Sequence, residues 1–211
     1  MLIDTGGSRS FPAPHKLLDA ARTDAAIALV IGTDVGSGLA RIEAPERLAA
    51  ILVELGTECA GVHAAEGAAN VLGFARFRLG DDPPSDLVEL VRLPATSQAA
   101  IDAAQALLGA SGLAVALCQD FAGRIIDRLV RPYFNAVLTK LDEGLASAAD
   151  LDLTVRLGLG YPVGPIALLE RSGLAHHCDV SAALFAAYGE PFYVPARRAR
   201  IAKERRMRGK S

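Results

Sequence analysis

The hydrophobic pattern of the chain changes near Gln119. Before this point, short apolar runs alternate with stretches of helical spacing, a pattern typical of an α/β protein with a mainly parallel sheet. From Asp120 onward, only helical spacing remains. The sequence therefore predicts two domains, an α/β domain over residues 1–119 and an all-α domain over residues 120–211.

The first half contains short apolar runs bounded by glycine, proline or charged residues, which predict strands. The predicted strands cover residues 27–31, 59–63, 71–79, 86–93 and 113–117. Helical spacing predicts helices over residues 14–22, 45–55 and 97–109. In the second half, helices are predicted over residues 121–143, 148–157, 166–171, 174–188 and 196–206. Pro132 lies inside the longest helix and is expected to bend it.

Composition excludes several classes of protein. The 211 residues are 51% hydrophobic, yet they include no run of about 18 apolar residues that would predict a membrane span. Cys59, Cys118 and Cys178 are widely spaced and form no C-x-x-C pair, so neither a zinc site nor a disulfide framework is predicted. The N-terminus lacks the pattern of a signal peptide. We therefore expect a cytoplasmic protein with reduced thiols.

The charge is concentrated at the C-terminus. Residues 197–210 hold eight basic residues and one acid, Glu204, in a chain whose net charge is −2. Such a tail can bind nucleic acid, a membrane surface or a phosphorylated ligand. The alternative, which we prefer, is a solvated helix that pairs with acids on its own body or on a partner subunit. A nucleic-acid partner is not expected, because no aromatic platform or known motif accompanies the tail.

Three motifs follow one another in the second half. They are D-F-A-G-R-I-I-D-R-L-V-R-P-Y-F-N from Asp120, E-G-L-A-S-A-A-D-L-D from Glu143, and G-L-G-Y-P-V-G-P-I-A-L-L from Gly158. In this order and spacing they resemble the C-terminal domain of the 3-hydroxyacyl-CoA dehydrogenase superfamily. The resemblance covers residues 113–195 and continues more weakly through residues 87–91, which look like the family's L-V-E-V-V strand.

The resemblance implies a fold class. The second half is expected to be a helical domain of the 6-phosphogluconate dehydrogenase C-terminal-like type. The first half is expected to be a reduced Rossmann-like domain, similar to the one that precedes the second C-terminal domain in two-copy bacterial 3-hydroxybutyryl-CoA dehydrogenases. Only about 118 residues precede the long helix, whereas a complete family member has about 180.

The resemblance also implies a reaction and its residues. The family oxidises 3-hydroxyacyl-CoA to 3-oxoacyl-CoA with NAD, in fatty-acid or aromatic-acid degradation. Glu89 stands at the position that orients the catalytic histidine, but Phe77 stands at the position of that histidine. Asp127 replaces an asparagine on the long helix; alternatively, it forms a helix ion pair with Arg124 or Arg131. The candidates for the substrate pocket are Gly160, Tyr161, Pro162, Gly164 and Pro165.

The residues themselves do not support a cofactor. Gly32, Gly36 and Gly38 follow a strand, but their spacing is not G-x-G-x-x-G, and Asp34 would stand where phosphates bind. We therefore expect a loop over residues 32–38, and NAD is implied by the resemblance alone. No spaced Cys/His/Asp cluster predicts a metal. His63, and the adjacent His176 and His177, do not obviously supply the missing base.

Two functions remain open at this point. The chain is either an enzyme of the 3-hydroxyacyl-CoA dehydrogenase family, with a nonstandard base or a partner that brings the NAD domain, or a non-catalytic dimerisation or acyl-CoA-binding module. The missing histidine and glycine loop favour the module. In both cases we expect a homodimer through the C-terminal helices and no membrane partner, and the resemblance adds acyl-CoA as a candidate ligand.

Overall fold

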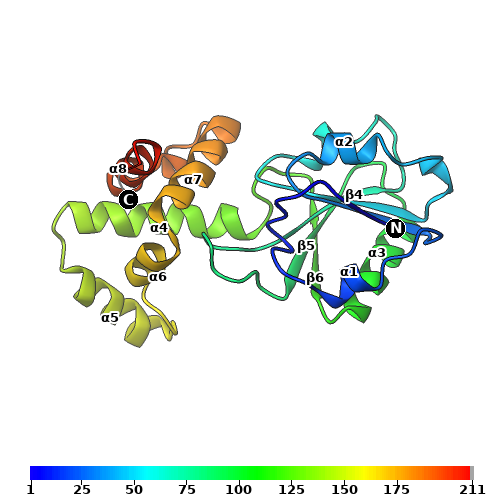
Figure 1. Cartoon of the computed structure of the whole chain (residues 1–211). Helices are drawn as coiled ribbons and strands as arrows, with labels where there is room; N and C mark the ends of the chain where they lie inside the picture. Colours follow the sequence, from blue (N-terminus) through cyan, green and yellow to red (C-terminus); the bar gives the residue numbers. More distant parts are fainter. Residues whose placement is uncertain (210–211) are drawn as a thin grey trace. The chain divides into compact units, whose positions relative to one another are not determined.

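The computed structural model describes residues 1–209. The chain folds into the two compact units of Figure 1. The sheet unit comprises residues 1–78 and 84–124, and the helical unit comprises residues 79–83 and 125–211. The predicted fold class is confirmed, because a Rossmann-like sheet with helices precedes an all-α region. The domain boundary between residues 119 and 120 stays a prediction.

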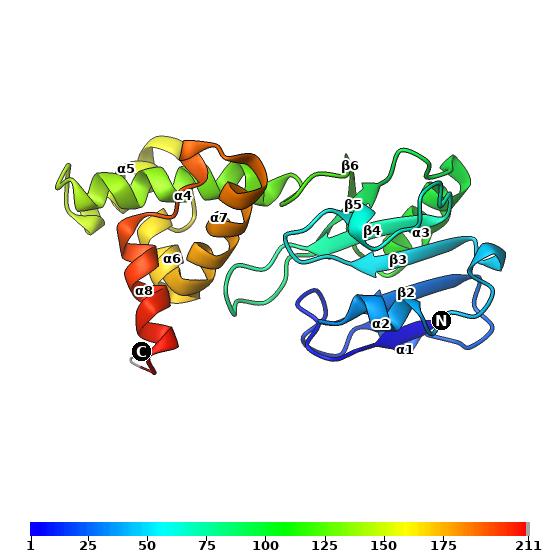
Figure 2. The ribbon, with the colours of Figure 1, turned by 90° about the horizontal axis from the view of Figure 1, so that it is seen from above.

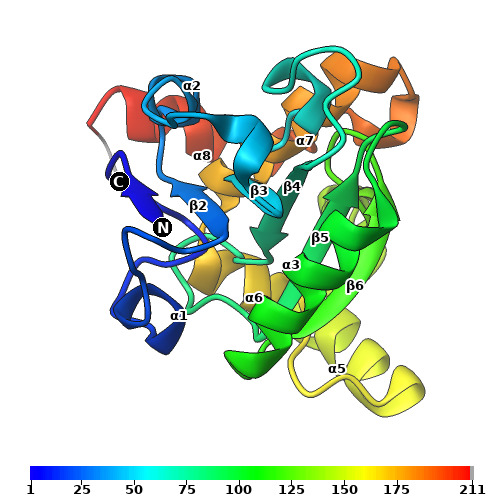
Figure 3. The ribbon, with the colours of Figure 1, turned by 90° about the vertical axis from the view of Figure 1, so that its right-hand side faces the viewer.

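The sheet unit is built on six strands that lie in sequence order. They are β1 (Leu2–Asp4), β2 (Ile27–Ile31), β3 (Ala50–Glu54), β4 (Val71–Arg76), β5 (Leu87–Arg92) and β6 (Ala114–Gln119). Each adjacent pair is parallel except β4 and β5, which are antiparallel. Figure 3 shows β2 to β6 side by side in this order.

Helices cover both faces of the sheet. α1 (Lys16–Asp19) and α3 (Gln98–Ala110) lie on one face, and α2 (Val35–Leu39) lies on the other (Figure 1). Two apolar cores result, one under α1 and α3 and one under α2. Strands covered on both sides are apolar at successive positions, as β2 and β3 are.

The predicted helix over residues 45–55 is wrong. Its second half is the strand β3, in which all five residues are buried between the two helical layers. A short continuous apolar run fits a buried strand and a buried helix equally well, so spacing alone cannot decide between them. The predicted strand over residues 59–63 is also wrong, because a 3₁₀ turn forms at Ala60–Val62.

The predicted loop over residues 32–38 is partly wrong, since its second half forms α2. Asp34 caps this helix by accepting a hydrogen bond from the Ser37 backbone N–H at 3.1 Å. The sequence reasoning also missed β1. By contrast, β2 is confirmed at the predicted residues, and α3 begins one residue after its predicted start, with Ser97 as its cap.

Within its described residues, the helical unit contains five α-helices and a 3₁₀ helix at Pro191–Tyr193. The α-helices are α4 (Ile126–Asp142), α5 (Ala148–Leu159), α6 (Pro165–Ser172), α7 (Leu174–Tyr188) and α8 (Arg197–Met207). α4 is the longest and contacts α5, α6, α7 and α8, as Figure 2 shows from above. It begins five residues later than predicted, because Gly123 and Arg124 have φ angles of +73° and +52°, which a helix excludes.

Gly80 offers a test of packing inside the helical unit. Its φ is +58°, and a Cβ built on it would overlap the carbonyl oxygen of Ser172 at the end of α6. We expect Gly80→Ala to lower the free energy of unfolding by roughly 2–5 kcal/mol, from the left-handed backbone and the overlap together. Gly144→Ala is the matched control, because Gly144 has a φ of +74° and open space around it. Urea titration should show the larger loss for Gly80→Ala, and equal losses would contradict the overlap.

Candidate functional site

Glu89 lies in the middle of β5, where the sheet register aligns it with Ala75 of β4. Phe77 follows β4 directly and stands two residues after Ala75. Phe77 therefore stands beyond the last residue of the strand, and its alignment with the family histidine stays a prediction. A phenyl ring cannot accept a proton, so Phe77 cannot serve as a base.

Glu89 is buried against an arginine. The Glu89 side chain is 2% exposed, and its Oε2 accepts a hydrogen bond from Nε of Arg124 at 3.3 Å. Arg124 is itself 7% exposed and holds a left-handed backbone conformation. The buried carboxylate is therefore neutralised by a guanidinium from its own unit.

The groups around this pair do not supply a base either. Burial, followed by the negative charge of Glu89, raises the pKa of the Cys118 thiol to about 11. Cys118 is therefore a neutral thiol at physiological pH. Asp120 accepts hydrogen bonds from the backbone N–H groups of Ala60 and Gly61 at 2.6 and 2.9 Å. Its carboxylate thus caps the 3₁₀ turn that replaces the predicted strand.

Asp127 also has an arginine partner, in the helical unit. Nε of Arg131, one helical turn along α4, lies 2.7 Å from Oδ1 of Asp127. Arg131 is 1% exposed, which makes it one of the largest fully buried side chains of the structure. The interpretation of Asp127 as a member of a helix ion pair is therefore supported with Arg131, whereas Arg124 pairs with Glu89 instead. A role of Glu89 and Asp127 in catalysis stays a prediction.

Arg131 also belongs to a buried polar network that includes His177 and Asn135. Its Nη1 lies 3.3 Å from Nδ1 of His177 on α7, and Nε2 of His177 lies 2.9 Å from Oδ1 of Asn135 on α4. Because a guanidinium only donates, Nδ1 is the acceptor and Nε2 carries the proton. Nδ2 of Asn135 donates to the Phe192 carbonyl oxygen at 3.2 Å and to Oγ of Ser181 at 3.4 Å.

His177 is a neutral, fully buried histidine. Burial, followed by the positive charge of Arg131, lowers its pKa from 6.5 to about 3. The sequence analysis missed the buried role of this residue, because it considered His176 and His177 only as candidates for the missing base. A signal was present on α4, where Asp127, Arg131 and Asn135 repeat at intervals of four and so form a polar stripe on one helix face.

The candidate residues for a substrate pocket lie between the end of α5 and the start of α6. Gly160 ends α5 with a φ of +71°, and Pro165 begins α6. Any Cβ at Gly164 would overlap the Asp152 side chain. Asp152 accepts hydrogen bonds from the Ile166 and Ala167 backbone N–H groups at 2.8 and 2.9 Å. Tyr161 and Pro162 are exposed, and the Tyr161 ring lies 6.2 Å from that of Tyr133. Their assignment to a pocket stays a prediction.

The edge of the sheet where dinucleotides bind carries carboxylates. A cavity of about 410 Å³ opens there, lined by residues that include Gly32, Glu54, Glu58 and His63. Glu54 is buried at the end of β3, and its two oxygens accept hydrogen bonds from the backbone N–H groups of Ser10 and Gly32 at 2.7 and 2.8 Å. Backbone N–H groups at this edge are the ones that hold a pyrophosphate in a dinucleotide fold. Here these N–H groups donate to the Glu54 carboxylate instead.

Glu58 adds a second negative charge to this cavity. Burial raises the pKa of Glu58, but hydrogen bonds from backbone N–H groups and the neighbouring His63 more than offset this effect, so the pKa lies below its usual value. Oε1 of Glu58 lies 3.3 Å from Nε2 of His63. His63 is therefore held by a carboxylate of its own loop. Arg9 also lines this cavity, but two carboxylates stand beside it, and Glu54 accepts from the N–H groups that a pyrophosphate would need, so the lining disfavours a pyrophosphate.

The strand order leads to the same conclusion. In doubly wound folds, a dinucleotide binds in the crevice where the strand order reverses direction. Within residues 1–209, the order follows the sequence from β1 to β6, so it contains no such reversal. The sheet therefore does not offer the crevice that an NAD molecule would occupy.

Three further features of the chain concern metal binding, membrane spans and the basic tail. Within residues 1–209, no group of three or more His, Cys, Asp or Glu side chains is arranged to hold a metal ion. The helices of the same described part are too short or too polar to cross a bilayer. In the basic tail, Lys203 and Arg206 pair with Asp179, and Arg198 pairs with Asp142. These contacts support pairing with acids of the same chain. Lys210 lies outside the described residues.

Comparison with known proteins identifies relatives of the helical unit. Residues 123–211 match the model of the 3-hydroxyacyl-CoA dehydrogenase, C-terminal domain. The chain is 37% identical over 92 residues to the human mitochondrial hydroxyacyl-coenzyme A dehydrogenase. This match covers 44% of the chain and 29% of the human protein. It is also 32% identical over 117 residues to a 3-hydroxybutyryl-CoA dehydrogenase of Mycobacterium tuberculosis. That match covers 54% of the chain and 40% of the mycobacterial protein. The chain thus spans less than half of these relatives.

Solved structures show a similar fold over most of the chain. An (S)-3-hydroxybutyryl-CoA dehydrogenase from Ralstonia eutropha superimposes with a TM-score of 0.73 at 24% identity, covering 87% of this chain and 66% of that one. A 3-hydroxybutyryl-CoA dehydrogenase from Escherichia coli superimposes with a TM-score of 0.74 at 23% identity, covering 88% of this chain and 40% of that one. At this identity the likeness establishes the fold alone.

The pKa of His177 predicts a dependence of stability on pH. In the unfolded chain, this histidine takes up a proton below about pH 6.5, whereas in the folded chain it stays neutral down to about pH 3. Its contribution to stability is therefore fully present above pH 6.5 and is lost as the pH falls toward 3. Between pH 7 and pH 5 the loss should be roughly 2 kcal/mol.

Urea titrations at pH 7 and pH 5 measure this loss. His177→Gln should lose less stability than the unmodified chain over the same interval, because the amide does not titrate. His176→Gln is the matched control and should retain the full loss. An equal loss in His177→Gln and in the unmodified chain would show that other groups cause the pH dependence.

Proposed function

We propose that the chain is a member of the 3-hydroxyacyl-CoA dehydrogenase superfamily, whose C-terminal domain its residues 123–211 match, and that it has no hydride-transfer activity. It serves as a dimerisation or acyl-CoA-binding module. One observation carries this proposal: both carboxylates that the resemblance assigns to catalysis, Glu89 and Asp127, are held in ion pairs by arginines of their own units.

The chemistry of the family reaction explains why these ion pairs matter. Oxidation of a 3-hydroxyl requires a base that removes the hydroxyl proton, and a carboxylate that orients this base. Here Phe77 replaces the base, and Glu89 accepts from the Arg124 guanidinium rather than from an imidazole. A buried carboxylate that loses its partner costs about 3–5 kcal/mol, so Arg124 stays in place. The proposal is further supported by Glu54, which takes the N–H group of Gly32 at the edge where NAD would bind.

Reduction of acetoacetyl-CoA by NADH tests the absence of catalysis. We expect the purified chain to leave the 340 nm absorbance of NADH unchanged and to show no thermal shift with NAD. A complete 3-hydroxyacyl-CoA dehydrogenase serves as the positive control. Turnover by the chain alone would refute the proposal. The alternative, an enzyme completed by a partner, predicts turnover above that of the complete dehydrogenase when the two proteins are mixed.

The assembly role rests on the exposed apolar side chains of α5 and the turn before it. Every residue of α5 is at least partly exposed, including Leu153, Leu157 and Leu159, and Leu145 is exposed nearby. Burial of apolar surface contributes about 25 cal/mol per Å², so an uncovered face of this kind favours association. We infer that a second copy covers it in a homodimer. The three free cysteines suit a reducing compartment and hence the cytoplasm.

Sedimentation equilibrium tests the dimer. At micromolar concentration the chain should sediment as a dimer, and Leu157→Glu should shift it to a monomer by placing a charge in the covered face. Met207→Glu on α8 is the matched control, because Met207 is 75% exposed and Leu157 is 76% exposed. A chain that is monomeric at this concentration, or a Met207→Glu variant that dissociates equally, would contradict α5 as the interface.

A further inference from the structure

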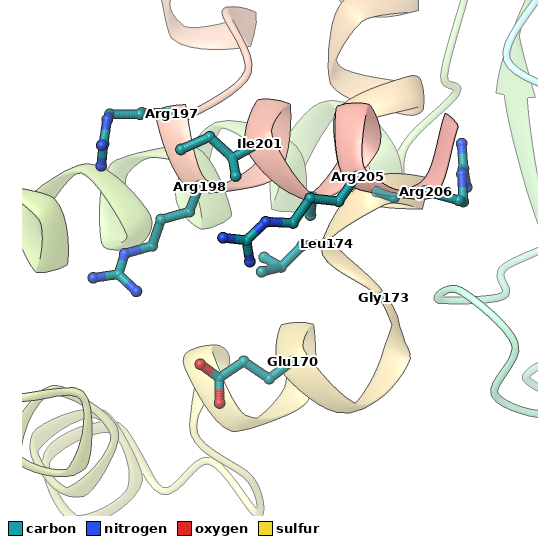
Figure 4. Close-up of a pocket in the computed structure, with 10 residues that line it drawn as sticks. Glu170, Gly173, Leu174, Arg197, Arg198, Ile201, Arg205 and Arg206 are labelled. Atoms are coloured by element: carbon teal, nitrogen blue, oxygen red, sulfur yellow. The ribbon is translucent and has the colours of Figure 1, made fainter. Parts of the chain in front are cut away.

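A second cavity lies within the helical unit. It has a volume of about 680 Å³ and opens between α8 on one side and the junction of α6 and α7 on the other (Figure 4). Apolar side chains, including Leu174 and Ile201, line part of its surface, and guanidinium groups surround them. The volume is within the range of about 300–1,000 Å³ found for sites that bind small organic molecules. We call it the α8 cavity.

One face of α8 lines this cavity. The lining residues of the helix are Arg197, Arg198, Ile201, Ala202, Arg205 and Arg206. They recur in adjacent pairs at intervals of four residues, so they share one face of the helix. An arginine pair stands at each end of this face, and Ile201 with Ala202 stands in the middle. At a rise of 1.5 Å per residue, the two arginine pairs are about 12 Å apart.

The guanidinium groups differ in what they already bind. Arg198 pairs with Asp142, and Arg206 pairs with Asp179. Within residues 1–209, Arg197 and Arg205 make no ion pair. In Figure 4 the Arg205 side chain extends across the opening of the cavity, close to Leu174. Arg205 is therefore a cation that faces the cavity and is not neutralised by the protein.

The start of α7 adds a second attraction for a negative charge. α7 is 15 residues long and begins at Leu174, after Gly173, which has no side chain to cap it. The first N–H groups of a helix lack partners within the helix and carry a partial positive charge. Those of Leu174 and Ala175 belong to residues that line the cavity. Glu170, on the opposite wall, is the acid among the lining residues.

We propose that the α8 cavity binds an amphipathic organic anion, whose carboxylate or phosphate group lies between Arg205 and the first N–H groups of α7. The apolar body of this ligand lies over Leu174 and Ile201. Glu170 repels the anionic group from the α6 wall and so sets the direction of the ligand. The site lies wholly in the helical unit and goes beyond the proposed function, because it requires neither dimerisation nor the absence of turnover.

Isothermal titration calorimetry with four probes tests the site and identifies the anionic group. The probes are octanoate, octanoyl-CoA, free CoA and inorganic phosphate at constant ionic strength. Saturable binding of octanoate identifies a carboxylate group, and binding of octanoyl-CoA without octanoate identifies a phosphate group. Either result supports the proposal, provided that inorganic phosphate binds at least tenfold more weakly. Failure of both octanoyl probes to bind below 1 mM would overturn it.

Substitutions locate the binding in the α8 cavity. Arg205→Gln should lower the affinity for the octanoyl probe at least tenfold, because it removes a charge-assisted hydrogen bond. Glu170→Gln should strengthen it severalfold by removing a like charge. Arg200→Gln is the matched control, since Arg200 is exposed on the same helix but does not line the cavity. If Arg200→Gln weakens binding as much as Arg205→Gln, the attraction is a general effect of the basic tail and the site does not exist.

Discussion

A buried carboxylate is stable only beside a compensating positive charge, and the arginines of this chain supply that charge at two positions. Arg124 neutralises Glu89 in the sheet unit, and Arg131 neutralises Asp127 in the helical unit. Removal of either arginine would leave an uncompensated charge at a cost of about 3–5 kcal/mol. The same contacts that stabilise each unit therefore hold both carboxylates against arginines.

In the helical unit, the ion pair of Arg131 also determines where the last helix lies. The network passes from Arg131 through His177 to Asn135, whose Oδ1 accepts a further hydrogen bond from the Ala196 backbone N–H at 3.2 Å. Ala196 is the residue before α8. The buried polar groups of α4 thus fix the start of the helix whose outer face lines the α8 cavity. A core of apolar residues alone would not specify this position as closely, because hydrogen bonds are directional.

The sequence was sufficient for elements whose pattern has one interpretation. α7 extends over the predicted residues 174–188, and β2 over residues 27–31, because each has a periodicity or a length typical of its class. The prediction for residues 50–54 was wrong, because burial on both faces removes the alternation of apolar and polar residues that identifies a strand. The partners of Glu89 and His177 could not be predicted at all. Arg124 lies 35 positions from Glu89, and Asn135 lies 42 from His177, and only the tertiary fold brings such residues together.

Two separate causes disfavour a dinucleotide at the edge of the sheet. The first is electrostatic, because Glu54 satisfies the N–H groups that a pyrophosphate would need. The second is topological, because the described strands never reverse their order and so form no crevice. A histidine placed at position 77 would remove neither cause, and it would still find Glu89 engaged with Arg124. The helical unit is under no such restriction, since its three motifs supply α4, α5 and α6, which contact one another within the unit.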